Sequence, residues 1–540
     1  MAGNKGTNVT DSDELDADQV RMKAIAVELE KKLVEGKFNE AFEGATLFHL
    51  EYPNSGPANI VYGLAALLTG RMDEADKAAQ LLSKLPESDF LIILEYWANQ
   101  LSAHQMMGPA YMVGLKILSL NVAEPRHFRS CAQVGLDNDD FVGLEQTLQG
   151  WSQRFPDDLG VSRYQARLLA HRGDLDGARK AAKKALKRTS DYGPALQSLA
   201  DLDSSLIDDK EIRRARSMKK GAKDFEQAHI CFALGKIFEN RDENDEAFAE
   251  YSEANAALKN YFVQKNKHYD HQGMVTYYGY ITKYTGGRED GDKSAQDRAS
   301  DPMPRPIFIV GQPSSGTTLM EQILSMHGEV RALGERTVIG EMLATVVQKK
   351  RSGEWRNGIP EKDVQALREF YFEDVQQEIK GFAAITDKMP GNFAAIGLVK
   401  DIFPEARIIH MTRDPRDICV SIFTCFFTAG GYYSVDLENI GKNYALYRSI
   451  MNHWQRNYDS HILDVPYETL TEDLEPTVRN ILDHCGLDYD ASCLEFQQSK
   501  NPTLPMGAGL AMRTLHTTPI GHWKKFEKHL GPLIEALNSA

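Results

Sequence analysis

The sequence predicts a protein in which an α-helical repeat array precedes an α/β domain with a parallel sheet and a P-loop-like turn. Three observations support this fold class. Residues 20–260 are helical in hydrophobic period and contain recurring phrases, strand-like and helix-like patterns alternate from residue 306 onward, and a glycine-rich turn follows the first strand-like run. A chain of 540 residues is long enough for two or more domains, each with its own core.

The repeats are recognised by their spacing. The phrases GKFNEA, GRMDEA and GDLDGA begin at Gly36, Gly70 and Gly173, and NDEA begins at Asn244. Their alanines at positions 41, 75, 178 and 247 are separated by 34, 103 and 69 residues, close to one, three and two units of 34. A glycine before a turn and a small residue where two helices touch, repeated with this period, is typical of tetratricopeptide repeats.

We count six or seven such units, and the proline positions agree with the pattern within a unit. Pro53, Pro86 and Pro156 fall where the second helix of a unit should end, because proline cannot continue a helix. Repeat arrays stack into a superhelix whose concave face holds a peptide or another protein. The alternative is a plain helical scaffold that supports the second domain or forms a homodimer, and both roles remain open.

The predicted domain organisation has four parts. Residues 1–19 are expected to be disordered, 20–260 to form the tetratricopeptide repeat domain, 261–305 a bridging helix and linker, and 306–540 the α/β domain. The bridging segment is rich in tyrosine and histidine. Its His268 and His271 lack an evident third ligand, so we expect a structural role for them.

Composition excludes several classes of function. The net charge of −15 and the pI near 5.5 disfavour nucleic acid as a partner. The polar, acidic first 20 residues do not resemble a signal peptide, and no run of about 18 apolar residues predicts a membrane span. Six scattered cysteines lack metal-ligand spacing, so we expect no metal and a cytoplasmic protein with reduced thiols.

The stretch from Pro306 to Met326 reads as strand, turn and helix. In such a turn the backbone N–H groups of Ser315 to Thr318 point toward one spot at the positive end of the helix dipole, where a phosphate binds. The spacing Gly311-x-x-x-x-Gly316-Thr317-Thr318 is a Walker A pattern in which Thr317 replaces the lysine. This argues against a Mg-dependent NTPase. Taken alone, the turn could be only a tight strand-to-helix connection.

A second stretch, Arg407 to Ser421, repeats this arrangement. Arg413 ends a strand, so its guanidinium could fork onto a phosphate, and Ser421 could add a hydroxyl two helical turns later. The alternative is a solvated turn whose Asp and Arg residues pair with each other.

Further strands are expected at Ala383–Thr386 and Ile462–Val465, in addition to Ile307–Val310 and Arg407–Thr412. The glycine-rich turn, Lys388 and Arg413 each follow a strand end. Because ligands of parallel α/β sheets bind at the carboxyl ends of the strands, these groups are predicted to share one site.

Together the two stretches resemble the 5′-phosphosulfate loop and the 3′-phosphate motif of sulfotransferases that use 3′-phosphoadenosine 5′-phosphosulfate (PAPS). The run Ser315 to Met320, His327 and Glu335-x-x-Val338-Ile339 look most like tyrosylprotein sulfotransferases and bacterial sulfotransferases fused to tetratricopeptide repeats. The resemblance covers roughly residues 306 to 537. It implies a sulfotransferase fold, PAPS as sulfate donor without a metal, and a hydroxyl acceptor, with protein tyrosine favoured.

The resemblance also implies roles for individual residues. Glu335 matches the general base, Lys388 the lysine that stabilises the bridging oxygen, and Thr514 a stabilising serine of the C-terminal segment. His327 is the rival base, although a histidine at this place is structural in the tyrosylprotein type. The implied cofactor-binding residues are Ser314, Ser315, Gly316, Thr317, Thr318, Arg413, Ser421, Tyr467 and Arg513.

Three positions depart from the family pattern. Ser314 replaces an arginine of the loop, Cys425 replaces a second arginine for the 3′-phosphate, and His522 precedes Trp523 where a basic residue is common. Each change weakens the expected binding of phosphate. Two other functions therefore stay open: a sulfotransferase for a carbohydrate or small metabolite, and a peptide-binding repeat scaffold with a degenerate nucleotide fold.

Overall fold

The computed structural model describes residues 17–34, 37–69, 107–137, 140–187, 192–284, 303–356, 358–373, 375–427, 431–498 and 520–538, with isolated positions between 71 and 98. The chain divides into two compact units, residues 1–164 and 165–540, which are described separately below. The division falls inside the range 20–260 predicted for the repeats. The four domain boundaries expected from the sequence remain predictions.

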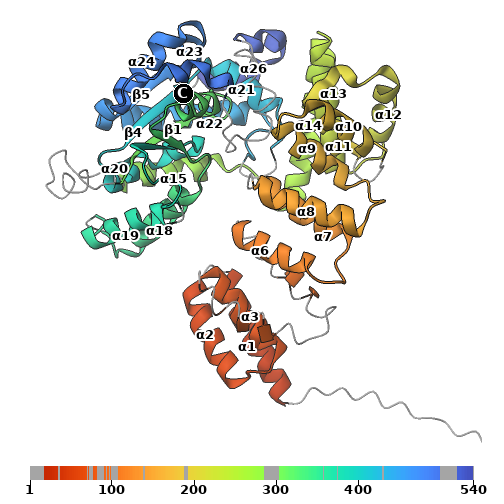
Figure 1. Ribbon diagram of the computed structural model, residues 1–540, viewed down its shortest axis with the longest axis vertical. Helices are drawn as coiled ribbons and strands as arrows, with labels where there is room; N and C mark the ends of the chain where they lie inside the picture. The colour runs from red at the N-terminus through yellow and green to blue at the C-terminus, as the bar shows by residue number, and fades with distance from the viewer. Residues whose placement is uncertain are drawn as a thin grey trace, which may run out of the picture. The chain divides into compact units, whose positions relative to one another are not determined.

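The first unit is helical wherever it is described with regular structure (Figure 1). Its helices are α1 (Ala17–Val34), α2 (Phe38–Glu51), α3 (Gly56–Leu68), α6 (Met107–Leu118), α7 (Pro125–Asp137), α8 (Phe141–Arg154) and the start of α9 (Val161–His171). Ala41 is fully buried near the start of α2. Pro53 and Pro156 lie just beyond the ends of α2 and α8, whereas Ala75 and Pro86 lie outside the described residues.

The second unit begins with further helices, so the predicted helical N-terminal region is confirmed. They are the rest of α9, α10 (Leu175–Ala185), α11 (Tyr192–Asp203), the short η1 (Ser204–Leu206), α12 (Asp209–Lys219), α13 (Asp224–Asn240), α14 (Asn244–Gln264) and α15 (His271–Tyr284). Ala178 and Ala247 are fully buried. Helices α13 and α14 approach closely at Gly235, where a Cβ atom would lie 2.6 Å from the Tyr251 ring. A side chain at this position would therefore force the two helices apart.

In the described residues, five parallel strands follow, in the order β2-β3-β1-β4-β5. The strands are β1 (Arg305–Gly311), β2 (Val330–Ala332), β3 (Ala384–Asp387), β4 (Arg407–Thr412) and β5 (Ile462–Pro466). In the register, Phe308 of β1 lies opposite Asp387 of β3 and Ile408 of β4. The prediction of a parallel sheet after a helical region is confirmed, and the carboxyl ends of all five strands lie at the same edge.

Both faces of the sheet are covered, as a parallel sheet requires. Along β1, Ile307 and Ile309 belong to one buried cluster and Phe308 and Val310 to another, which is the period-two alternation of a strand. The helices of this part are α17 (Thr317–Ser325), α18 (Val338–Ser352), α19 (Glu361–Phe372), η2 (Pro390–Ala395), α20 (Ile396–Ile402), α21 (Pro415–Phe423), α22 (Leu437–Tyr458), η3 (Asp459–His461), α23 (Tyr467–Glu472), α24 (Leu474–Cys485), η4 (Ala491–Gln498), η5 (His522–His529) and α26 (Gly531–Asn538).

Helix α14 packs directly against the α/β part of the second unit. The amide of Asn255, buried in α14, donates to the Phe423 carbonyl at 2.8 Å, near the end of α21. The ring of Phe248 stacks on Phe423 at 5.5 Å and on His529 of η5 at 4.3 Å. These contacts explain why helices that precede residue 264 and the sheet form one compact unit. Among the described helices, none is both long and apolar enough to cross a membrane.

Candidate functional site

The turn between β1 and α17 has the backbone geometry that a phosphate loop needs. Ser314 and Gly316 adopt φ angles of 68° and 104°, which reverse the chain between the strand and the helix. A Cβ atom at residue 316 would lie 2.7 Å from the Tyr467 ring, so only glycine fits there. Within the described part of the chain, no side chain caps the N-terminus of α17, so its first N–H groups are available there to an anion.

Ser315 supplies an independent indication of a ligand. This residue is fully buried, and within the described part of the chain its Oγ atom has no hydrogen-bond partner. A buried hydroxyl without a partner costs free energy unless a bound group satisfies it. The loop residues Ser314 to Thr318 therefore fit the phosphate end of a nucleotide.

Arg413 joins this loop to the end of β4. Its Nη1 atom donates to the Ser314 carbonyl at 3.1 Å, and its guanidinium carbon lies 4.7 Å from the centre of the Tyr467 ring. Arg413 is buried, so it presents a positive charge inside the site rather than in solvent. Ser421 is buried two turns along α21, but within the described residues no polar contact joins its hydroxyl to this cluster.

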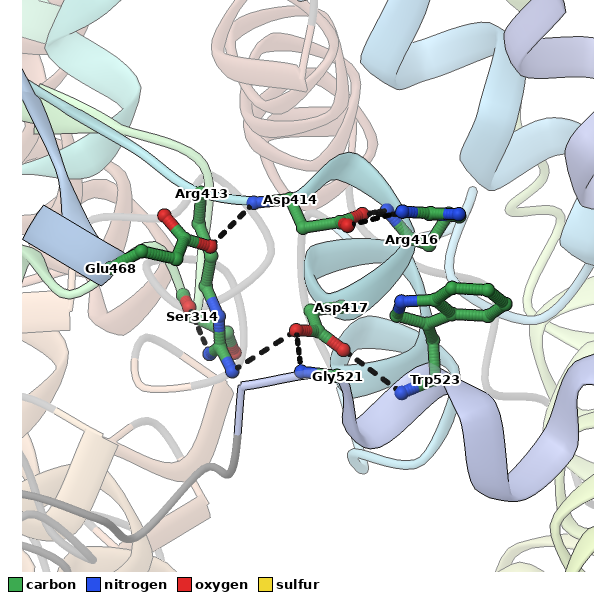
Figure 2. Close-up of polar contacts among 8 residues, drawn as sticks. All are labelled: Ser314, Arg413, Asp414, Arg416, Asp417, Glu468, Gly521 and Trp523. Carbon is green, nitrogen blue, oxygen red and sulfur yellow. Dashed lines mark hydrogen bonds and ion pairs between the residues drawn. The ribbon is translucent and has the colours of Figure 1, made fainter.

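Asp417 connects Arg413 with the C-terminal segment (Figure 2). Its carboxylate lies 3.8 Å from Nη2 of Arg413 and accepts the backbone N–H groups of Gly521 at 2.7 Å and Trp523 at 2.9 Å. Arg416 pairs with Asp414 at 2.6 Å, and its guanidinium lies 3.9 Å from the Trp523 ring centre. The loop at Ser314 and the C-terminal segment at Gly521 to Trp523 thus both contact the segment where α21 begins, although they are distant in sequence.

Asp417 is a functional residue that the sequence patterns did not single out. The available signal was its position four residues after Arg413, which places two opposite charges on one face of a helical segment. The contact to Gly521 and Trp523 could not be read from any spacing. Arg513 and Thr514, predicted for the same C-terminal segment, lie outside the described residues.

Glu335 and Lys388 meet on the other side of β1. Lys388 follows β3 directly, and its backbone N–H donates to the Gly334 carbonyl at 2.9 Å. Its buried ammonium group donates to the carboxylate of Glu335, whose side chain is 35% exposed. The two predicted catalytic residues therefore form an ion pair in which Glu335 is accessible and Lys388 is buried.

Glu321 is hydrogen-bonded to the segments that carry this pair. The sequence did not predict this role. The Glu321 carboxylate accepts the Gly334 N–H and the Thr386 hydroxyl, each at 3.0 Å. Burial raises the pKa of Glu321 to about 7, although the nearby Lys388 ammonium and these hydrogen bonds oppose the shift. A charged residue in the apolar run LMEQIL was the signal that a specific buried contact was present.

Asp387 shows the same behaviour next to Lys388. Burial raises its pKa to about 7 against the attraction of Arg336, while Tyr371 and Asn392 both donate to its carboxylate at 3.1 Å. Carboxyl groups with raised pKa values close to a paired lysine are typical of functional sites.

His327 is engaged on both ring nitrogens. Its Nδ1 atom accepts the Glu329 N–H at 3.1 Å, and its Nε2 atom donates to the Asp488 carbonyl at 3.0 Å. An imidazole held in this way fixes a turn and has no nitrogen left for an acceptor proton. This arrangement favours the structural role expected from the resemblance.

One group of described residues has the spacing of metal ligands, namely Cys231, Glu250 and Glu253. The Lys219 ammonium donates to Glu250 at 2.9 Å and to Glu253 at 2.8 Å. A cation of the chain itself therefore already occupies the position between these carboxylates.

A family match identifies the class of the α/β part. Residues 306–491 match the family model described as "Sulfotransferase family", and they form a sulfotransferase domain. This domain is similar to those of tyrosylprotein sulfotransferases, as the resemblance predicted. Protein-tyrosine sulfotransferase 1 of Danio rerio is 27% identical over 208 residues, which is 36% of this chain and 56% of that protein.

Another relative extends beyond this domain. An uncharacterized protein of Aquifex aeolicus is 25% identical over 471 residues, covering 84% of this chain and 60% of the relative. This chain thus spans at most 60% of the length of these two relatives. The sulfotransferase domain of the Synechococcus PCC 7002 olefin synthase aligns with a TM-score of 0.31 and 19% identity over 44% of this chain and 96% of that domain.

Proposed function

We propose that the chain transfers a sulfuryl group from PAPS to a hydroxyl acceptor, and that the acceptor is a protein tyrosine. The observation that carries the proposal is the placement of Glu335 and Lys388 on one side of the phosphate loop and of Arg413 on the other. PAPS, when bound, supplies the sulfuryl group and a phosphate as leaving group. The chain must supply phosphate binding, a base, and a cation for the leaving oxygen.

The described residues offer a candidate for each of these needs. Ser315 and the N–H groups at the start of α17 would hold the 5′-phosphate, and Arg413 the 3′-phosphate. Glu335 would take the proton from the acceptor oxygen, which replaces the 5′-phosphate oxygen on sulfur. Lys388 has three N–H donors, so its ammonium can keep its bond to Glu335 and also donate to the leaving oxygen.

The helical region is proposed to be a tetratricopeptide repeat array that docks a protein acceptor or another partner. The alternative is that the same surface forms a homodimer. The burial of Ala41, Ala178 and Ala247 supports the repeat interpretation. We also propose a reducing compartment such as the cytoplasm, which the six free cysteine thiols support.

Binding of the nucleotide product tests the proposal first. Isothermal titration of the full chain with 3′-phosphoadenosine 5′-phosphate (PAP) should give saturable binding, and the parent should transfer radiolabelled sulfate from PAPS to a tyrosine-containing peptide. If PAP does not bind, the scaffold function is the correct one. If PAP binds and only a saccharide accepts sulfate, the acceptor assignment is wrong.

A further inference from the structure

A cavity of about 420 Å³ lies beside the phosphate loop in the second unit. Its walls include Gly311, Gln312 and Pro313, which lead into the loop, and Pro390 and Gly391, which follow Lys388 by two and three residues. Strands β1 and β3, which deliver these two segments, are hydrogen-bonded neighbours. The cavity therefore adjoins both the loop and the segment of the proposed catalytic lysine.

Aromatic side chains form much of the remaining wall. Tyr269 and Tyr433 meet edge to face with ring centres 6.0 Å apart, and Tyr278 lies 6.0 Å from Phe393. Tyr432 also lines the space. Rings held in different orientations around a cavity can contact both the face and the edge of a further ring. A cavity of this size accommodates a small molecule or one large side chain.

One wall comes from residues 268–278, which precede the part of the chain that matches the sulfotransferase family. The segment is held firmly. The carboxylate of Asp270 accepts the Gly273 N–H at 2.9 Å at the start of α15, and the Tyr269 hydroxyl contacts His271 Nδ1 at 3.1 Å. Further along α15, Ile281 is fully buried in the core on the Phe308 face of the sheet.

We infer that residues 268–278 form a specificity-determining wall of this cavity, and that the cavity receives the aromatic ring of the proposed tyrosine acceptor. The inference rests on the proposed sulfotransferase activity and adds the part of the chain that selects its second substrate. The tyrosine-rich segment that the sequence analysis assigned only to a bridge thus acquires a role in substrate choice.

Filling the cavity from two sides tests the inference. A Cβ atom at Gly391 would have no heavy atom within 4 Å, so Gly391→Phe should place a ring in the space without displacing the backbone. Met274→Trp fills the cavity from α15 instead. The matched control is Gly279→Leu, on the same helix but exposed, outside the cavity lining and also with open space around its Cβ.

The measurements are PAP affinity and the affinity of the PAP-loaded enzyme for p-cresol and for a tyrosine-containing peptide, with galactose as the saccharide probe. Both cavity variants should keep the parent's PAP affinity and bind p-cresol and the peptide at least tenfold more weakly, whereas Gly279→Leu should match the parent. Unchanged phenol binding in both cavity variants overturns the inference. Loss of PAP binding in them, or tighter binding of galactose than of p-cresol by the parent, also overturns it. Absence of PAP binding by the parent would instead refute the proposed function.

Discussion

The buried pair of Arg413 and Asp417 offers the sharpest test of the nucleotide site. Both side chains are at most 1% exposed, and the closest atoms of their charged groups are 3.8 Å apart. Asp417→Asn keeps the shape but replaces a carboxylate oxygen with an NH₂ group and removes the negative charge. Arg413→Gln removes the positive charge while Asp417 keeps its two backbone N–H donors, from Gly521 and Trp523.

The two variants should differ in their effect on stability. A buried cation that loses its counter-ion costs about 3–5 kcal/mol, so Asp417→Asn should lower the free energy of unfolding by that amount. Arg413→Gln should cost less, about 1–3 kcal/mol, because the remaining carboxylate is still hydrogen-bonded. The double variant should lose less than the sum of the two, with a coupling of about 0.5–3 kcal/mol.

The affinity for PAP should rank the two variants in the opposite order to their stability. Arg413→Gln removes the guanidinium that would bind a phosphate through two N–H groups, and it should weaken PAP binding by about 2–5 kcal/mol, roughly 30-fold to several-thousand-fold in Kd. Asp417→Asn keeps that cation and should weaken binding less. Arg416→Gln is a suitable control, because its ion pair is partly exposed and should contribute less than about 1 kcal/mol.

Urea unfolding and isothermal titration with PAP measure the two rankings. The expected signature is that the less stable variant binds PAP more tightly. If the two variants rank in the same order in both assays, or if Arg413→Gln binds PAP as tightly as the parent, the assignment of Arg413 to a phosphate is refuted.

The remaining predictions concern four other residues of the site. Glu335→Gln should slow single-turnover sulfate transfer about 10²–10⁴-fold with PAP affinity unchanged, whereas His327→Asn should mainly lower the thermal midpoint; near-parent turnover by Glu335→Gln would contradict the mechanism. Ser314→Arg should tighten PAP binding, because it adds a cation beside the proposed 5′-phosphate site. Ser314 is exposed and adopts a positive φ, so the longer side chain has room and the variant keeps the backbone conformation of the parent. Equal or weaker binding in titration would mean that another cation serves the 5′-phosphate. Burial raises the pKa of Glu321 from 4.5 to about 7, so the folded state binds this proton more tightly than the unfolded state does. The free energy of unfolding should therefore fall as the pH rises from about 4.5 to 7, and Glu321 should account for about 3 kcal/mol of the fall. Glu321→Gln should abolish that part of the slope in urea midpoints measured across this range, and an unchanged slope would exclude the assignment.

The sequence alone determined that a helical region precedes an α/β domain, and it determined where most of the strands lie. Hydrophobic period is a local property, so Arg407–Thr412 was predicted with the bounds that β4 has, and the run Ile307–Val310 lies within β1. The phosphate loop was predictable for the same reason, because its glycines and its following helix are adjacent in the chain. The resemblance then indicated Glu335 and Lys388, which the structure brings into contact.

Only the tertiary structure decided which distant groups support these residues. Asp417 binds the C-terminal segment about a hundred residues away, Glu321 lies beneath Gly334 and Thr386, and α14 packs on the end of α21. The same holds for the cavity beside the loop, whose walls come from α15, η2 and the segment before α22. Such contacts depend on how whole elements pack, and no period or spacing within a single segment records them. Local sequence therefore predicted the loop and the arginine that we propose to bind phosphate, while packing determined the buried charges around them and the cavity proposed for the acceptor.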